Sequence, residues 1–221
     1  MIRRLMLPAM LVGTMVLSSS LLAKEKSSER ALGAEKECSA CPIATAMKNL
    51  PQITYAVGKE TTSCAVSASK LAEKQSTAIV YLVGTKKFAD AGKAKIALVS
   101  ATEEFVDNFA KPSVCKVSGT TTIAGQNTEC SETAAKLTTL VSNAMKNVRM
   151  TYAVGSESCD CPHAAASLAK TSGKPKLFVV GNEKTECEVT ARLNLARAKY
   201  RAMVEALAEA EKKTKAVLKE S

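Results

Sequence analysis

Thr151-Tyr152-Ala153-Val154-Gly155 repeats, without a single change, an earlier stretch of the same chain, Thr54-Tyr55-Ala56-Val57-Gly58. The two copies lie 97 residues apart, and the likeness continues at the same offset from Tyr81-Leu82-Val83-Gly84 to Phe178-Val179-Val180-Gly181. Self-similarity at a fixed distance along a chain indicates a duplicated structural block. We therefore expect the fold to be built from repeated pieces.

A smaller unit lies inside the duplicated block. Four glycines share one spacing: an aromatic residue stands three positions before each, Val directly before it, and Cys or Asp six positions after it. Alternating β-branched and aromatic residues that end at Gly predict a strand and a hairpin turn, and the apolar spacing beyond the Cys predicts one face of a helix. We expect turns at Gly58, Gly84, Gly155 and Gly181, with a looser copy at Gly125. We expect helix starts within two residues of Cys64, Asp90, Cys130, Cys161 and Cys187.

These units predict an α+β fold of five tandem ββα (hairpin–helix) units, arranged as two doublets around one single unit. In the second helix of the first doublet, the spacing places Ala94, Leu98, Ala101, Phe105 and Phe109 on one face. In the last helix it predicts a buried face of Leu193, Ala196, Tyr200, Met203 with Val204, and Leu207. The predicted segments are a signal peptide at 1–23, a disordered leader at 24–36, a first doublet with a leading short helix at 37–111, a single unit at 112–148, a second doublet at 149–208 and a charged C-terminal helix end at 209–221.

The N-terminus predicts export. Arg3 and Arg4 precede an apolar core of 13 residues from Leu5 to Leu17, and small residues follow it. This pattern is typical of a secretory signal peptide and is too short for a membrane span. No later stretch is long and apolar enough to cross a bilayer, so we expect a bacterial-type secreted or periplasmic protein with no membrane span after signal removal.

The charge of the chain is basic but dispersed. Lys and Arg number 31 against 21 Asp and Glu, a formal net charge of +10, which becomes +8 once Arg3 and Arg4 are removed. One basic cluster stands out, Arg192, Arg197, Lys199 and Arg201. It could contact an anionic polymer or a membrane surface, whereas nucleic-acid binding is not expected, because the one aromatic residue within the cluster, Tyr200, belongs to the predicted buried face of the last helix.

All eight cysteines follow the signal peptide, in a part of the chain where disulfides are permitted. Cys115 and Cys130 flank the hairpin of the single unit, and we expect that hairpin to bring them within bridging distance. Cys38, Cys41 and Cys64 are further disulfide candidates. Cys38-x-x-Cys41 at a helix start also fits thiol–disulfide redox chemistry, although only the charged leader precedes it.

The single unit resembles the YHS/TRASH-type metal-binding modules, which are small ββα domains. The likeness rests on Cys115-x-Val117-x-Gly119, then Gly125, then Cys130 at a helix start. It implies a ββα scaffold with thiolate ligands. The second helix Cys of that family is replaced here in every unit, by Ala68, Ala94, Ala134, Ala165 and Ala191.

A separate candidate metal site is Cys159-Asp160-Cys161-Pro162-His163, which places two thiols beside the only His of the chain. With Cys187 from the next helix start, these side chains could surround one Cu(I) or Zn²⁺ ion, because thiolates and imidazole suit both metals. The alternative is that Cys159 and Cys161 are bridged elsewhere and that His163 is a solvated residue of the first helical turn.

Catalysis is not expected. With one His, the only nucleophile–base pair is Cys161 and His163, and two residues along a helix start is poor geometry for proton transfer. We therefore predict a non-enzymatic exported protein that binds a soft metal ion or a protein partner. A disulfide-stapled structural module and a thiol–disulfide redox protein remain alternatives.

Overall fold

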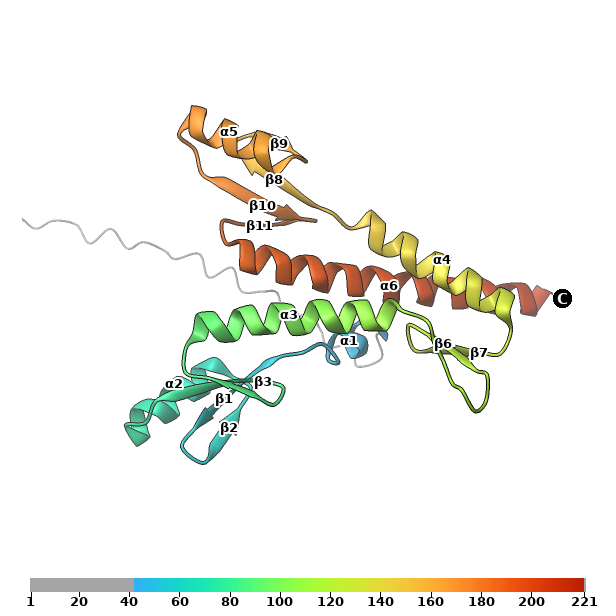
Figure 1. The fold of residues 1–221 in the computed structure, drawn as a ribbon, viewed down its shortest axis with the longest axis horizontal. Helices are drawn as coiled ribbons and strands as arrows, with labels where there is room; N and C mark the ends of the chain where they lie inside the picture. Colours follow the sequence, from blue (N-terminus) through green and yellow to red (C-terminus); the bar gives the residue numbers. More distant parts are fainter. Residues whose placement is uncertain (1–41, 221) are drawn as a thin grey trace, which may run out of the picture. The chain divides into compact units, whose positions relative to one another are not determined.

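The computed structural model describes residues 42–220, which form a mixed α/β structure (Figure 1). Hairpins alternate with helices along the chain, and the predicted signal peptide, leader, Cys38 and Cys41 lie outside the described residues. None of the helices in the described part combines the length and the apolarity needed to cross a bilayer.

The first sheet joins two hairpins edge to edge. Its strands are β1 (Ile53–Val57), β2 (Glu60–Thr62), β3 (Ile79–Val83) and β4 (Lys86–Phe88), in the order β2-β1-β3-β4. The central pair, β1 and β3, is antiparallel, and Tyr55 lies opposite Tyr81 at its middle. The two rings stack edge to face with centroids 5.7 Å apart, an arrangement that aromatic pairs favour.

The second sheet repeats this plan. It contains β8 (Met150–Val154), β9 (Glu157–Cys159), β10 (Lys176–Val180) and β11 (Glu183–Thr185), in the order β11-β10-β8-β9. Tyr152 lies opposite Phe178 in the antiparallel central pair. Both of the sheets built from the duplicated sequence therefore pair two hairpins about a central aromatic pair.

The third sheet differs from the other two. It consists of β5 (Ser113–Val114), β6 (Thr121–Ile123) and β7 (Gln126–Thr128) in sequence order, so a short extra strand precedes its hairpin. The helices that follow the hairpins also differ from one another in length, from 11 residues in α2 and α5 to 33 in α6. The hairpin–helix pieces are thus not copies of one exact unit. The six helices of the described chain are α1 (Pro42–Met47), α2 (Ala65–Gln75), α3 (Ala91–Ala110), α4 (Ser131–Asn147), α5 (Pro162–Ser172) and α6 (Glu188–Glu220).

The predicted turns are confirmed at all five glycines. Each lies between two antiparallel strands with a positive φ, for example +61° at Gly155. At that position a Cβ atom would meet only the flexible side chain of Lys174, which can move away, so the backbone conformation is what favours glycine.

One core joins segments that lie far apart in the sequence. Helices α3 and α4 both pack against α6 (Figure 1). The core gathers Leu50 after α1, Val106 of α3, Ile123 of β6, Val141 of α4 and Tyr200 of α6. The predicted face of α6 is confirmed, since Leu193, Ala196, Tyr200, Met203 and Leu207 are all buried.

The predicted face of α3 packs against the core. Ala94 and Leu98 are buried, while Ala101, Phe105 and Phe109 are half-buried against the core clusters. Val99, Thr102 and Val106 are buried as well, because α3 packs both on its own sheet and on α6. A helix with two partners needs a wider apolar surface than one stripe.

The start of α3 provides a test of helix capping. Oδ1 of Asp90 accepts a hydrogen bond from the backbone N–H of Lys93 at 2.7 Å. Replacing Asp90 with Ala should lower the free energy of unfolding by about 1 kcal/mol, whereas Asp90→Ser should retain most of it, because Ser also caps. Urea unfolding of the three proteins measures this, and equal losses in both variants would contradict a capping role.

Candidate functional site

Exposed thiols recur at the helix starts. Cys64, Cys130 and Cys161 are the N-cap residues of α2, α4 and α5, and Cys187 directly precedes α6. All four predicted positions are confirmed, and all four side chains are exposed and free. Unpaired backbone N–H groups and the positive end of the helix dipole gather at such positions.

A hydroxyl three residues further on faces three of these sulfurs. Ser67, Thr133 and Thr190 lower the pKa of the thiols of Cys64, Cys130 and Cys187 respectively, and the backbone N–H groups of the first helical turn add to this. The neutral thiols of Cys64 and Cys130 make no cap hydrogen bond, but the donors around each sulfur favour the thiolate. Sequence reasoning overlooked this C-x-x-[ST] spacing, although it can be read directly along the chain. Cys161 lacks the hydroxyl, because Ala164 stands at that position.

A second hydroxyl holds the backbone of each cysteine. A threonine stands two residues before three of the cysteines. Its Oγ1 accepts a hydrogen bond from the backbone N–H of the cysteine, with an N–O distance of 3.2 Å in each case. The pairs are Thr62 with Cys64, Thr128 with Cys130, and Thr185 with Cys187. Cys159 takes this place before Cys161, and its Sγ lies 3.8 Å from the carbonyl oxygen of Cys161. Cys159 therefore occupies the position that, in the other three units, is a threonine bonded to the residue before the helix.

Cys115 lies in a turn rather than at a helix start. Its N–H donates to the carbonyl of Thr120 at 2.9 Å, and the N–H of Gly119 donates back to the Cys115 carbonyl at 2.8 Å. The hydroxyl of Ser118, followed by the N–H groups of Ser118 and Val117, lowers the pKa of the Cys115 thiol to about 7. The sulfur is exposed, and the neighbouring Val117 is 98% exposed. Cys115 thus combines accessibility with a stabilised thiolate.

Cys187 differs from the other three helix-start thiols by a contact from another helix. Nζ of Lys95 in α3 donates to Oγ1 of Thr190 at 2.6 Å, and its charge also helps to lower the pKa of the Cys187 thiol. Cys64 and Cys130 instead have a lysine six residues along their own helices, Lys70 and Lys136. In α6 that position is Leu193, which is buried against α3.

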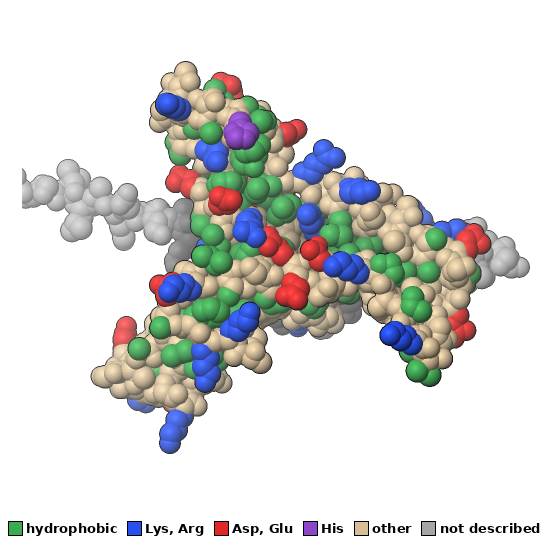
Figure 2. Space-filling model, in the orientation of Figure 1, with side chains coloured by type: hydrophobic (Ala, Val, Ile, Leu, Met, Phe, Trp, Pro, Cys, Tyr) green, Lys and Arg blue, Asp and Glu red, His purple; other side chains and the backbone are tan. Residues whose placement is uncertain are grey.

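The predicted metal ligands do not converge. Within residues 42–220, no group of three or more His, Cys, Asp or Glu side chains is placed to hold a metal ion. His163 is exposed, and it is the purple side chain in Figure 2. The expected convergence of Cys187 with Cys159, Cys161 and His163 is therefore corrected, while binding of Cu(I) or Zn²⁺ by these residues stays a prediction.

The sheet topology explains the separation. Strands β9 and β11, which lead to Cys161 and Cys187, form opposite edges of the four-stranded sheet. Three strand spacings of about 4.8 Å separate the two edges, roughly 14 Å in all. Because every pairing in this sheet is antiparallel, β9 and β11 also end at opposite ends of it.

The disulfide candidates stay predictions. Cys64, Cys115 and Cys130 are free thiols in the structure, as are the other described cysteines. Cys38 and Cys41 lie outside the described residues, so their pairing is not addressed.

The basic cluster of α6 separates into distinct environments. The guanidinium of Arg192 donates to both carboxylate oxygens of Glu103 at 3.0 and 2.7 Å. Arg197 and Arg201 line one cleft, whereas Lys199 lines another. On the face drawn in Figure 2, the lysines and arginines are dispersed and do not gather into one patch.

The chain matches no protein-family model, no curated protein and no solved structure with which it was compared.

Proposed function

We propose that this chain is an exported thiol protein whose exposed cysteines exchange disulfides, one at a time, with small disulfide molecules. The observation that carries the proposal is the recurrence of one local arrangement, an exposed free cysteine with a Ser or Thr hydroxyl three residues later, at Cys64, Cys115, Cys130 and Cys187. A hydroxyl donor beside a cysteine sulfur stabilises the thiolate, which is the nucleophilic form of the side chain.

The exchange step is balanced without a further reagent. The Cys thiolate attacks one sulfur of a disulfide RSSR, a new sulfur–sulfur bond forms, and RS⁻ leaves. The cysteine is oxidised to a mixed disulfide and the departing sulfur is reduced. The Ser or Thr hydroxyl and the N–H groups stabilise the attacking thiolate before the reaction.

The proposed role is to carry a thiol group and not to turn over a substrate. A dithiol catalyst releases its mixed disulfide by attack of a second, neighbouring thiol. Cys159 and Cys161 are the nearest pair in sequence, but a Cys-x-Cys disulfide closes a small, strained ring. A mixed disulfide on one of the described cysteines would therefore persist until another small thiol removed it.

We also infer that the hairpin–helix pieces correspond to five ββα units, two doublets around a single unit, and that the protein is secreted or periplasmic. The shared spacing of turn glycine, N-cap residue and following alanine supports the first inference. The charged and apolar residues at 1–23 support the second. The resemblance to YHS/TRASH-type modules stays a prediction from the sequence. So does the binding of a soft metal ion or of a protein partner.

The test uses the contrast that the chain itself contains. The reduced full chain is incubated with glutathione disulfide, and the mixed disulfide at each cysteine is quantified by mass spectrometry over time. We expect Cys64, Cys115, Cys130 and Cys187 to react at least about threefold faster than Cys161, because each of these four has a hydroxyl donor that stabilises its thiolate.

Two matched variants distinguish the effect of the hydroxyl on the reaction rate from the effect of the helix N-terminus. Ala164→Ser should accelerate Cys161, and Thr190→Val, which removes only a hydroxyl at similar volume, should slow Cys187. If all six described cysteines react at one rate in all three proteins, the proposal fails. It also fails if protein taken from an oxidising compartment has these cysteines bridged to one another.

A further inference from the structure

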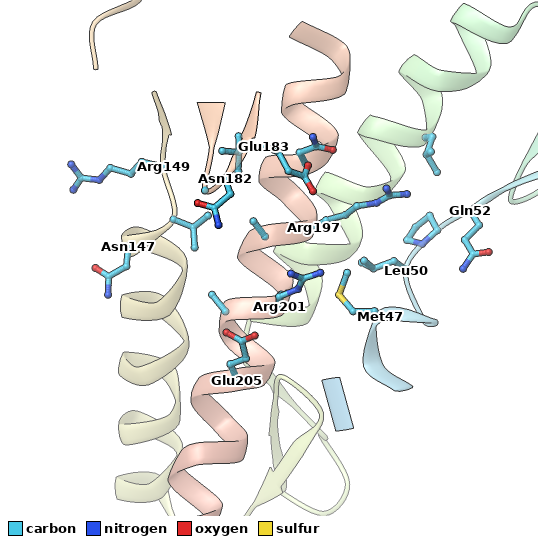
Figure 3. Close-up of a pocket in the computed structure, with 18 of the residues that line it drawn as sticks. Met47, Leu50, Gln52, Asn147, Arg149, Asn182, Glu183, Arg197, Arg201 and Glu205 are labelled. Carbon is cyan, nitrogen blue, oxygen red and sulfur yellow. The ribbon is translucent and has the colours of Figure 1, made fainter. Parts of the chain in front are cut away.

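A cleft lies beside α6, away from the thiols described above. Its walls are α6, the connection from α1 to β1, the connection from α4 to β8 and the turn between β10 and β11 (Figure 3). Its volume is about 1150 Å³, enough for an organic molecule and far more than a single ion requires. None of the six cysteines in the described part of the chain lines it.

Two arginines of α6 extend into this cleft on the same side. Arg197 and Arg201 are one helical turn apart, and both point toward the segment that contains Met47, Leu50 and Gln52 (Figure 3). Arg149 also belongs to the lining but points away from α6 (Figure 3). Like charges at this spacing repel each other.

No carboxylate forms an ion pair with either arginine in the described structure. The ion pairs found among residues 42–220 are Lys136 with Glu132 and Arg192 with Glu103, so neither Arg197 nor Arg201 takes part in one. Glu183 and Glu205 also line the cleft and flank the arginine pair along α6 (Figure 3). They would repel an anionic group placed beyond the arginines, which confines one anionic group to the pair.

The rest of the lining suits an apolar body. Met47, Leu50, Ile53, Leu98 and Val180 contribute apolar surface. Planar guanidinium groups bind carboxylate and phosphate oxygens with two parallel hydrogen bonds, and an apolar wall beside them accommodates the rest of the ligand.

We propose that this cleft binds a small organic molecule with one oxyanion group, a carboxylate or a phosphate, held by Arg197 and Arg201, and with an apolar body against Met47, Leu50 and Leu98. This site is independent of the thiol chemistry, and either one can fail while the other holds.

The experiment uses three probes that share one ring system: 2-naphthyl phosphate, 2-naphthoate and the cation 2-naphthylmethylammonium. The chain has no Trp, so naphthyl fluorescence can be followed directly on the full protein. We expect saturable binding of at least one anionic probe and none of the cation. The anion that binds more tightly identifies the oxyanion, and both assignments support the site.

Paired variants make the test specific. Arg197→Gln with Arg201→Gln should raise the Kd of the anionic probe at least tenfold. Lys199→Gln with Lys212→Gln, which removes the same charge from the same helix outside the cleft, should change it less than twofold. Circular dichroism checks that both variants are folded.

Three results would overturn the proposal: no saturable binding of either anion at millimolar concentration, equal binding of the cation, or equal weakening by the two pairs of substitutions. The last result would mean that the net charge of the protein attracts the probe, and the cleft would have no part in binding.

Discussion

Tyr200→Ala should lower the free energy of unfolding by about 3–5 kcal/mol, the range measured when a buried large aromatic side chain is truncated. Tyr200 is 1% exposed, and its ring packs edge to face on Phe105 and Phe109 with centroid distances of 5.5 and 4.9 Å. These contacts join α6 to α3, so the cavity left by Ala would open between two helices. Urea unfolding followed by circular dichroism gives the difference.

Tyr200→Phe is the matched control. Burial, the larger influence, raises the pKa of the phenol, while the Asn49 side chain lowers it. Phe keeps the ring and loses only the hydroxyl, so we expect a cost of roughly 1 kcal/mol. A similar loss in both variants would show that the hydroxyl, and not the packing of the ring, is what stabilises this core.

The local elements could be predicted because their signals are local. A glycine with positive φ at a hairpin turn and a polar or thiol residue before a helix are each dictated by a few neighbouring residues. Gly155 and Cys161 illustrate this, because the turn and the start of α5 lie only six residues apart and each is determined by its immediate neighbours. The face of α6 was equally accessible, because one periodic pattern determines it.

The order of strands could not be predicted in the same way. Nothing in the spacing around Gly58 or Gly84 states that β1 pairs with β3, or that the pair is antiparallel. Side chains that look equivalent in sequence therefore end up at opposite edges of a sheet. The predicted convergence of Cys187 with Cys161 depended on this pairing, and for that reason it was wrong.

The shared core and the cleft could not be predicted from the sequence either. The sequence showed Arg192, Arg197 and Arg201 as one cluster, but the packing of α6 against α3 and α4 determines what each of them faces. Arg192 meets Glu103 on α3, while Arg197 and Arg201 face a cleft. Contacts between segments about 90 residues apart in the chain produce no periodic pattern in the sequence of either segment, so sequence periodicity cannot predict them.

Cys115 should be the most reactive thiol of the described chain near neutral pH. With the pKa of its thiol lowered from 9.0 to about 7, about half of it is thiolate at pH 7, against about one per cent for an unperturbed thiol. A lower pKa also makes each thiolate a weaker nucleophile, by roughly six- to tenfold over two pKa units. The two effects leave a net advantage of about fivefold. Alkylation of the Cys115 peptide by iodoacetamide, quantified by mass spectrometry between pH 5 and pH 10, gives the rate and its midpoint.

The folding equilibrium should respond to the same thiol. Because the folded pKa lies below the unfolded value, the Cys115 thiolate stabilises the fold fully above about pH 9, and this contribution disappears as the pH falls through about 7. Cys115→Ser should therefore reduce the stability difference between pH 9.5 and pH 6. The sulfur is exposed, so the effect is expected to be small beside that of Tyr200→Ala.

Ser118→Ala tests the cause, since the Ser118 hydroxyl has the largest influence on the Cys115 thiol. Its removal should move the alkylation midpoint upward toward 9 and slow the reaction at pH 7 several-fold. Lys116→Ala is the control, because hydrogen bonds to Ser118 and Val117, and no neighbouring charge, lower this pKa. A midpoint above about 8.5 in the unmodified protein would contradict the prediction. So would a larger shift in Lys116→Ala than in Ser118→Ala, because the thiolate would then depend on charge and the shared hydroxyl spacing would lose its chemical meaning.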